Sequence, residues 1–277
     1  MTRGIQALMI GIGVLSFAVC AGVDEGHAAD GATSSRVVAL GEAGPGVIES
    51  GLKEVLEKKF LGMSVKAVTK TEVPGWYLVE TDTGSPDGIM YIHEGGRYVL
   101  SGGLFDIAVG RNLTQEYVSD RQARILASLN RGQLLVLNPT SPRVKDPVLI
   151  FDDPDCPVCR RMHPEVKQLV DAGVPVGVVL FPLMRPHPDA YRKSVAIWCS
   201  SDRASALEQV LLGSPIESPV QSCDHPVDAN LKLAKQLGVN QTPIVFLPNG
   251  RRIEGFHKAA DILAALNLPS THTSDEK

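Results

Sequence analysis

The second half of the chain alternates between short apolar runs and longer segments in which apolar residues recur with helical spacing. The runs 148–151 and 174–181 predict strands, and the segment 156–172 between them predicts a helix. Further patterns predict three helices, then two strands and a closing helix, at 190–199, 203–212, 227–237, 244–247, 251–255 and 258–266. This order predicts an α/β domain, which we place at residues 141–270.

The first half has the pattern of a smaller α+β domain. Apolar residues recur on one helix face from Ile48 to Phe60. Strand-like runs follow at 64–70, 76–80, 89–93 and 97–101. A Glu-Gly-Gly turn at 94–96 predicts a hairpin between the last two runs. One helix and a small antiparallel sheet therefore predict a domain over residues 46–112.

Residues 113–140 are predicted to connect the two domains. A helical pattern begins near Thr114 or Ser119, and Ser119 with Gln122 has the spacing of a capping box. The pattern ends before a proline-rich stretch that starts at Pro139. We therefore expect a linker helix followed by an irregular connection.

The two ends of the chain are predicted to lie outside the domains. A basic start, an apolar run and small residues near Ala28 or Ala29 predict a cleaved signal peptide over residues 1–29. The alternative is an uncleaved membrane anchor, because the apolar segment 4–23 is about long enough to span a bilayer. Small polar residues predict a flexible N-terminus at 30–45, and residues 271–277 form a tail.

Composition and cysteine count narrow the class of protein. The 277 residues are 44% hydrophobic with a net charge of −4, which disfavours disorder and a nucleic-acid partner. Without Cys20 of the leader, four cysteines remain, and an even number in an exported chain suggests two disulfides. Three pairings are possible, of which Cys156 with Cys159 and Cys199 with Cys223 is the simplest.

The motif Cys156-Pro157-Val158-Cys159 stands where a predicted strand meets a predicted helix. The helix N-terminus lowers the pKa of a thiol placed there, so Cys156 is the expected nucleophile. Cys159, one turn later, is expected to be less exposed and to resolve a mixed disulfide by attacking Cys156. A C-x-x-C pair within a strand–helix–strand unit is typical of a thioredoxin-like domain.

The charged residues around the motif do not settle how strongly Cys156 is activated. Arg160 and Arg161 add positive charge, and three aspartates oppose it, at Asp152, Asp153 and Asp155. A zinc site is disfavoured because no second close ligand pair is present. A purely structural disulfide is disfavoured because so short a loop constrains little of the unfolded chain. No metal and no cofactor are expected.

Thr242-Pro243 directly precedes the predicted strand 244–247. A proline at this position can simply mark a sheet edge. The alternative is a cis bond that presents the backbone of Thr242 to a peptide lying beside Cys156. Sequence leaves both open, because few X-Pro bonds are cis.

Together these residues resemble the periplasmic disulfide isomerase family that comprises DsbC and DsbG. The likeness is carried by the F-D-D-P-D-C-P-V-C segment, the A-I-W-C run at 196–199, Cys223-Asp224, and L-G-V at 237–239 leading to Thr242-Pro243. It implies a cystatin-like dimerisation domain, a linker helix and a thioredoxin-like catalytic domain with a helical insertion. It also implies a homodimer, with Thr242 and Pro243 forming a cis-proline loop that binds substrate.

The resemblance further implies how the thiols are used. The Cys199–Cys223 pair looks like the structural disulfide of the DsbC branch, whereas Pro157 is similar to DsbG. Clients would be misoxidised exported proteins, and a membrane thiol reductant of the DsbD type would keep the active pair reduced. The function expected is a periplasmic disulfide isomerase and reductase. The alternative is a reductase of sulfenylated cysteines with dimeric chaperone activity, and a simple oxidase would require a monomer.

Overall fold

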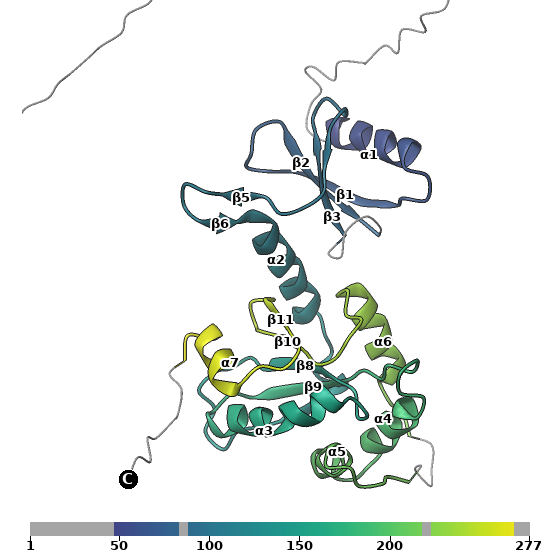
Figure 1. Ribbon diagram of the computed structural model, residues 1–277, viewed down its shortest axis with the longest axis vertical. Coiled ribbons are helices and arrows are strands. Elements are labelled where there is room, and N and C mark those ends of the chain that lie inside the picture. Colours follow the sequence, from purple (N-terminus) through teal and green to yellow (C-terminus); the bar gives the residue numbers. More distant parts are fainter. Residues whose placement is uncertain (1–46, 83–87, 218–222, 269–277) are drawn as a thin grey trace, which may run out of the picture. The chain divides into compact units, whose positions relative to one another are not determined.

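The protein is described by a computed structural model, which covers residues 47–82, 88–217 and 223–268 (Figure 1). The segments predicted as signal peptide, flexible N-terminus and tail lie outside these ranges. Within them, no helix combines the length and the apolar character needed to cross a membrane.

The N-terminal region is an antiparallel sheet of four strands with a helix packed on it. Helix α1 (Val47–Lys59) has acidic Glu49 in its first turn and two lysines in its last, which favours the helix through its dipole. The strands lie in the order β1-β2-β3-β4, with the bounds Val65–Lys70, Trp76–Thr81, Ile89–His93 and Val99–Leu100.

Strand alternation divides the residues of this sheet between two apolar clusters. Tyr77 and Val79 pack with Leu52 and Leu56 of α1. Leu78, between them in sequence, belongs to a second cluster that includes Val118 of the following helix. Both faces are therefore covered, which is why strand β2 is almost continuously buried.

The linker helix α2 (Leu113–Ala127) follows a small hairpin, β5 (Phe105–Asp106) with β6 (Arg111–Asn112), that the sequence pattern did not predict. The capping box predicted at Ser119 and Gln122 is wrong. Asn112 caps the helix instead, because its extended backbone lets its side-chain oxygen accept the Gln115 N–H at 3.0 Å.

The C-terminal region is a five-stranded sheet in the order β11-β10-β8-β9-β7. The bounds of these strands are Arg252–Glu254, Ile244–Phe246, Val148–Asp152, Val176–Leu180 and Leu135–Leu137. Strands β8 and β9 are parallel and joined through helix α3 (Pro157–Asp171), and the other pairs are antiparallel. Strand β7 lies in the segment predicted to be an irregular connection. A short η1 turn (Arg131–Gln133) precedes it.

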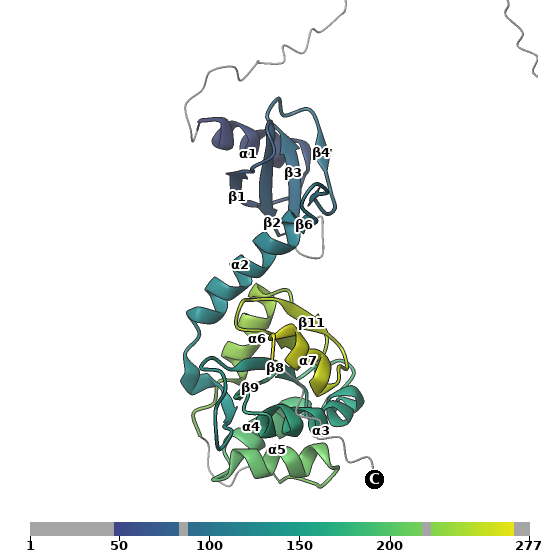
Figure 2. The ribbon, with the colours of Figure 1, turned by 90° about the vertical axis from the view of Figure 1, so that its left-hand side faces the viewer.

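Helices cover both faces of this sheet, and Figures 1 and 2 show α3 and α6 on opposite sides of it. Val148 and Ile150 pack with residues of α3, α5 and α7, whereas Leu149 and Phe151 pack with residues of α6. The remaining helices run over Ala190–Trp198 (α4), Arg203–Leu211 (α5), Val227–Gln236 (α6) and Ala259–Ala265 (α7). Strand β8 is thus buried throughout, and its carboxyl end carries the chain directly to Cys156.

Candidate active site

Cys156 occupies the N-cap position of helix α3, four residues after strand β8 ends. Its N–H donates to the carbonyl of Asp153 at 3.0 Å, which closes the turn between strand and helix. Pro157 takes the first helical position, where a missing N–H leaves no bond unmade. Cys159 follows one helical turn later, and the two residues are 5% and 1% exposed.

The surroundings of Cys156 stabilise its thiolate. Its pKa falls from an ordinary 9.0 to about 5, chiefly because the Cys159 side chain hydrogen-bonds to it. Burial opposes this effect, and the Thr242 side chain and the N–H groups of Val158 and Cys159 reinforce it. The amides belong to the first turn of α3, so the helix terminus contributes as the sequence predicted.

The surroundings of Cys159 stabilise its protonated thiol instead of the thiolate. Its pKa is raised, first because its thiol is hydrogen-bonded to Cys156, then because it is buried, and then because Asp152 lies nearby. The pair is therefore asymmetric, with a reactive thiolate at Cys156 and a buried thiol at Cys159.

Thr242 and Pro243 lie beside this pair, although they are far away in sequence. The bond between them is cis, and the Cys156 thiol donates to the Thr242 carbonyl with Sγ and O 3.5 Å apart. The Thr242 hydroxyl oxygen is buried and has no hydrogen-bond partner among the described residues. It is therefore free to donate to the thiolate form of Cys156, in line with the lowered pKa.

The three aspartates before the motif have three different environments, whereas sequence reasoning treated them as one opposing charge. Asp155 pairs with Lys193 at 2.5 Å and with Arg160 at 3.6 Å. Asp152 is buried, and burial is the main cause that raises its pKa to about 7. Lys193 was missed because it lies 38 residues away on helix α4, with no local pattern linking it to the motif.

Asp153 anchors the loop that presents Cys156. It is fully buried, and its carboxylate accepts the N–H of Asp155 at 2.7 Å and of Leu183 at 2.6 Å. His187 Nδ1 lies 3.0 Å from the same carboxylate. These contacts tie the end of β8 to the segment after β9, so Asp153 and His187 hold the loop in which Cys156 stands.

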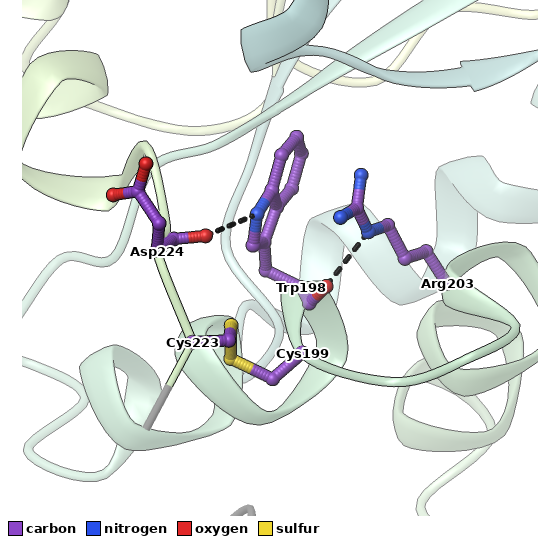
Figure 3. Close-up of a disulfide and its surroundings, with 5 residues drawn as sticks. All are labelled: Trp198, Cys199, Arg203, Cys223 and Asp224. Atoms are coloured by element: carbon purple, nitrogen blue, oxygen red, sulfur yellow. Dashed lines mark hydrogen bonds between the residues drawn. A yellow bond between two sulfur atoms is a disulfide. The ribbon is translucent and has the colours of Figure 1, made fainter. Parts of the chain in front are cut away.

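Cys199 and Cys223 form a disulfide that joins the end of α4 to the segment before α6, with a Cα–Cα distance of 5.8 Å (Figure 3). Beside it, Trp198 Nε1 donates to the Asp224 carbonyl at 3.1 Å. The Arg203 guanidinium stacks 3.8 Å from the centre of the Trp198 ring. In the part of the chain that the structure describes, no group of three or more His, Cys, Asp or Glu side chains is placed to hold a metal.

A thiol pair of this asymmetry, at the first helix of a thioredoxin-like sheet, defines a thiol–disulfide oxidoreductase. Comparison with known proteins narrows the class. Residues 142–268 match a family model described as a thioredoxin-like domain, and residues 28–115 match one described as the disulfide bond isomerase protein N-terminal domain.

Relatives among known proteins specify the family. The probable thiol:disulfide interchange protein DsbC of Bordetella pertussis is 30% identical over 208 residues, which cover 74% of this chain and 69% of that protein. The DsbC of Escherichia coli K12 is 25% identical over 228 residues, 82% of this chain and 90% of that protein. A crystal structure of a disulfide interchange protein from Neisseria gonorrhoeae, 30% identical, covers 50% of this chain and 96% of its own, with a TM-score of 0.42. The chain belongs to the DsbC family of thiol:disulfide interchange proteins.

Proposed function

We propose that this DsbC-family chain is a periplasmic, homodimeric protein disulfide isomerase and reductase, with Cys156 as nucleophile and Cys159 as resolving thiol. The observation that carries the proposal is the hydrogen-bonded thiol pair at the start of α3, in which one cysteine has a pKa of about 5 and its neighbour keeps its proton. Because a thiolate attacks disulfides and a thiol does not, this asymmetry supports the proposed order of the two cysteines.

The reaction begins when the Cys156 thiolate attacks one sulfur of a non-native disulfide. A mixed disulfide forms, and the other substrate sulfur leaves as a thiolate. In isomerisation, a substrate thiolate then attacks the mixed disulfide, which forms a new substrate disulfide and returns the Cys156 thiolate. In reduction, Cys159 attacks Cys156 instead, the substrate leaves reduced, and the enzyme retains the disulfide. An external dithiol of the DsbD type is then needed to restore the reduced pair.

Thr242 and Pro243 are proposed to hold the substrate chain during these steps. The Thr242 carbonyl lies 3.5 Å from the Cys156 sulfur, so a peptide bonded to that sulfur must pass the Thr242 backbone. An extended peptide can pair with backbone groups at such a position. Cys199 and Cys223 are proposed to be structural only.

The N-terminal region supports the proposed dimer. It matches the family's N-terminal domain, and several large apolar side chains in and around β4–β6 are exposed: Tyr98, Val99, Leu100, Phe105, Ile107 and Val109. Light scattering on the purified protein is expected to give twice the mass of one chain. The predicted signal peptide and the Cys199–Cys223 disulfide support an exported location, because disulfides persist in oxidising compartments.

Refolding of a scrambled multi-disulfide protein tests the function. Cys156→Ala is expected to abolish the activity, because no nucleophile remains. Cys159→Ala is expected to keep part of the isomerisation and to accumulate mixed disulfides, visible on a non-reducing gel. Full activity in Cys156→Ala would overturn the proposal. Rates on a sulfenylated single cysteine, measured beside these, distinguish an isomerase from the alternative sulfenic-acid reductase.

A further inference from the structure

A short turn after strand β9 lies close to the thiol pair and has no part in the reaction described above. The His187 N–H donates to the Leu183 carbonyl at 2.9 Å, which closes residues 183–187 into one turn. Both ends of the turn are bonded to the Asp153 carboxylate, through the Leu183 N–H at 2.6 Å and His187 Nδ1 at 3.0 Å. Because the Asp153 carbonyl accepts the Cys156 N–H at 3.0 Å, one residue connects the turn to the nucleophile.

The tip of this turn presents an apolar and a cationic side chain to solvent. Met184 is 51% exposed, and Arg185 and Pro186 are exposed as well. The Arg185 guanidinium makes no hydrogen bond or ion pair with any residue that the structure describes. A flexible methionine adapts to partners of different shape, and an unpaired guanidinium is available to bind a carboxylate.

The sheet topology places a second exposed arginine on the opposite side of the nucleophile. Strand β8 leads to the thiol pair, the turn follows β9 on one side, and the cis bond at 242–243 precedes β10 on the other. Strand β11 ends beside that bond, since the Gly255 N–H donates to the Pro243 carbonyl at 2.9 Å. The next residue is Phe256, and the Arg161 guanidinium lies 5.0 Å from the centre of its ring. Each side of the site therefore combines an arginine with an apolar side chain.

The two arginines differ from the other charged groups around the thiol pair. The solvent-accessible carboxylates on the surrounding segments have cationic partners: Asp155 with Lys193 at 2.5 Å, Asp189 with Arg192 at 2.7 Å and Glu254 with Arg252 at 2.9 Å. Within the described ranges, Arg161 and Arg185 form no ion pair with a carboxylate. The whole chain has a net charge of −4, so this local excess of positive charge has the opposite sign.

We propose, resting on the function proposed above, that Arg161 and Arg185 are specificity-determining residues that select client chains with acidic residues beside the reacting cysteine. A client bonded to Cys156 passes between the turn 183–187 and the cis bond at 242–243, so the residues before and after its cysteine meet one arginine each. A guanidinium binds a carboxylate through two parallel hydrogen bonds, which distinguishes an acidic client residue from a basic one. The apolar side chain beside each arginine excludes some water and strengthens the pair.

Short peptides activated with thionitrobenzoate test this selection. Each peptide has blocked ends and one cysteine in a mixed disulfide with thionitrobenzoate, flanked on both sides by glutamate in one peptide and by lysine in the other. The Cys156 thiolate attacks the peptide sulfur, the peptide becomes bonded to Cys156, and thionitrobenzoate leaves as a coloured thiolate. The leaving group is the same for both peptides, and their rates with mercaptoethanol correct for intrinsic reactivity.

The corrected ratio of the two rates is the measured quantity. In the full-length reduced wild type, the glutamate peptide is expected to react about three- to tenfold faster than the lysine peptide at low ionic strength, because exposed charge pairs each contribute a few-fold. The ratio should fall toward one in about 0.5 M salt. Arg161→Gln and Arg185→Gln should each lower it, and the double variant should bring it close to one. Replacing both arginines with lysine keeps the charges and should keep the ratio above one.

Arg251→Gln is the matched control. It makes the same charge change at an exposed residue of the turn after β10, at the end of that strand away from the cis bond, and should keep the wild-type ratio. A wild-type ratio at or below one, which needs no variant to observe, would overturn the proposal. A ratio that the double glutamine variant leaves unchanged would also overturn it. Failure of the wild type to release the coloured thiolate from either peptide would instead overturn the proposed role of Cys156.

Discussion

Replacing Cys159 with alanine is predicted to make Cys156 a much weaker acid. The Cys159 thiol is the first cause of the low Cys156 pKa, ahead of the Thr242 side chain and the helix amides. Alanine removes this donor, whereas burial of Cys156, which raises its pKa, remains. The midpoint of the Cys156 titration is therefore expected to move from about 5 toward the ordinary 9.0, by at least about one pH unit.

The magnitude follows from the thiolate populations. A pKa of 9.0 lowered to about 5 corresponds to at most about 5 kcal/mol in favour of the thiolate. One hydrogen bond to a charged acceptor contributes about 1.5 to 3 kcal/mol. Loss of the Cys159 donor can therefore account for one to two pH units and leaves the remainder to Thr242 and the amides.

Alkylation by iodoacetamide between pH 3.5 and 9 measures the midpoint, because only the thiolate reacts. Cys199 and Cys223 are disulfide-bonded and do not contribute. Cys159→Ser is the matched variant, since its hydroxyl still donates to the thiolate and should give a smaller rise than alanine. A midpoint that stays near 5 in Cys159→Ala would refute this account and would assign the low pKa to Thr242 and the helix amides.

Three further outcomes are expected from the structure. Replacing both Cys199 and Cys223 with alanine should lower the free energy of unfolding by about 3 kcal/mol, because their disulfide closes a loop with a sequence separation of 24. An unchanged midpoint of urea unfolding would contradict this prediction. Asn112→Ala should destabilise helix α2 by about 1 kcal/mol, measured by urea unfolding, and Asn112→Ser should recover most of it. Reduced wild-type protein should lose about 1 kcal/mol of stability per pH unit, relative to Cys156→Ala, as the pH falls from 9 to 7. Because the pKa of Cys156 is lowered in the folded state, its thiolate stabilises the fold fully above pH 9.0. This stabilisation is lost as the pH falls toward about 5. Equal slopes of unfolding free energy against pH in the two proteins would show that the pKa shift is absent.

Periodicity predicted most of the fold. The expected helix at 156–172 is α3 at 157–171, and the expected strand at 148–151 is β8 at 148–152. The family comparison confirms a DsbC N-terminal domain followed by a thioredoxin-like domain. The missed elements are strands of two or three residues, such as β7, which are defined by pairing with a neighbour and contain too few positions to show alternation.

The candidate site was predicted less completely than the fold. Local sequence rules identified Cys156 and Cys159, since a C-x-x-C pair at a helix start is a local pattern. Lys193 and His187 reach the site through tertiary packing and have no sequence signal of their own. The sign of the electrostatic tuning was likewise undetermined, because the dominant cause is a hydrogen bond within the thiol pair and not the charge count around it.

The neighbouring acids Asp152 and Asp153 show why a charge count fails here. Successive residues at the end of a strand point to opposite faces of the sheet. Ile150 packs on the face that carries Cys156 and Cys159, and alternation places Asp152 on that face, beside the thiols. Phe151 packs on the other face, toward Phe181, and Asp153 follows it there to meet Leu183 and His187. Asp152 therefore lies beside the thiols while Asp153 holds the loop, and replacing Asp153 with asparagine should impair folding whereas Asp152→Asn should not.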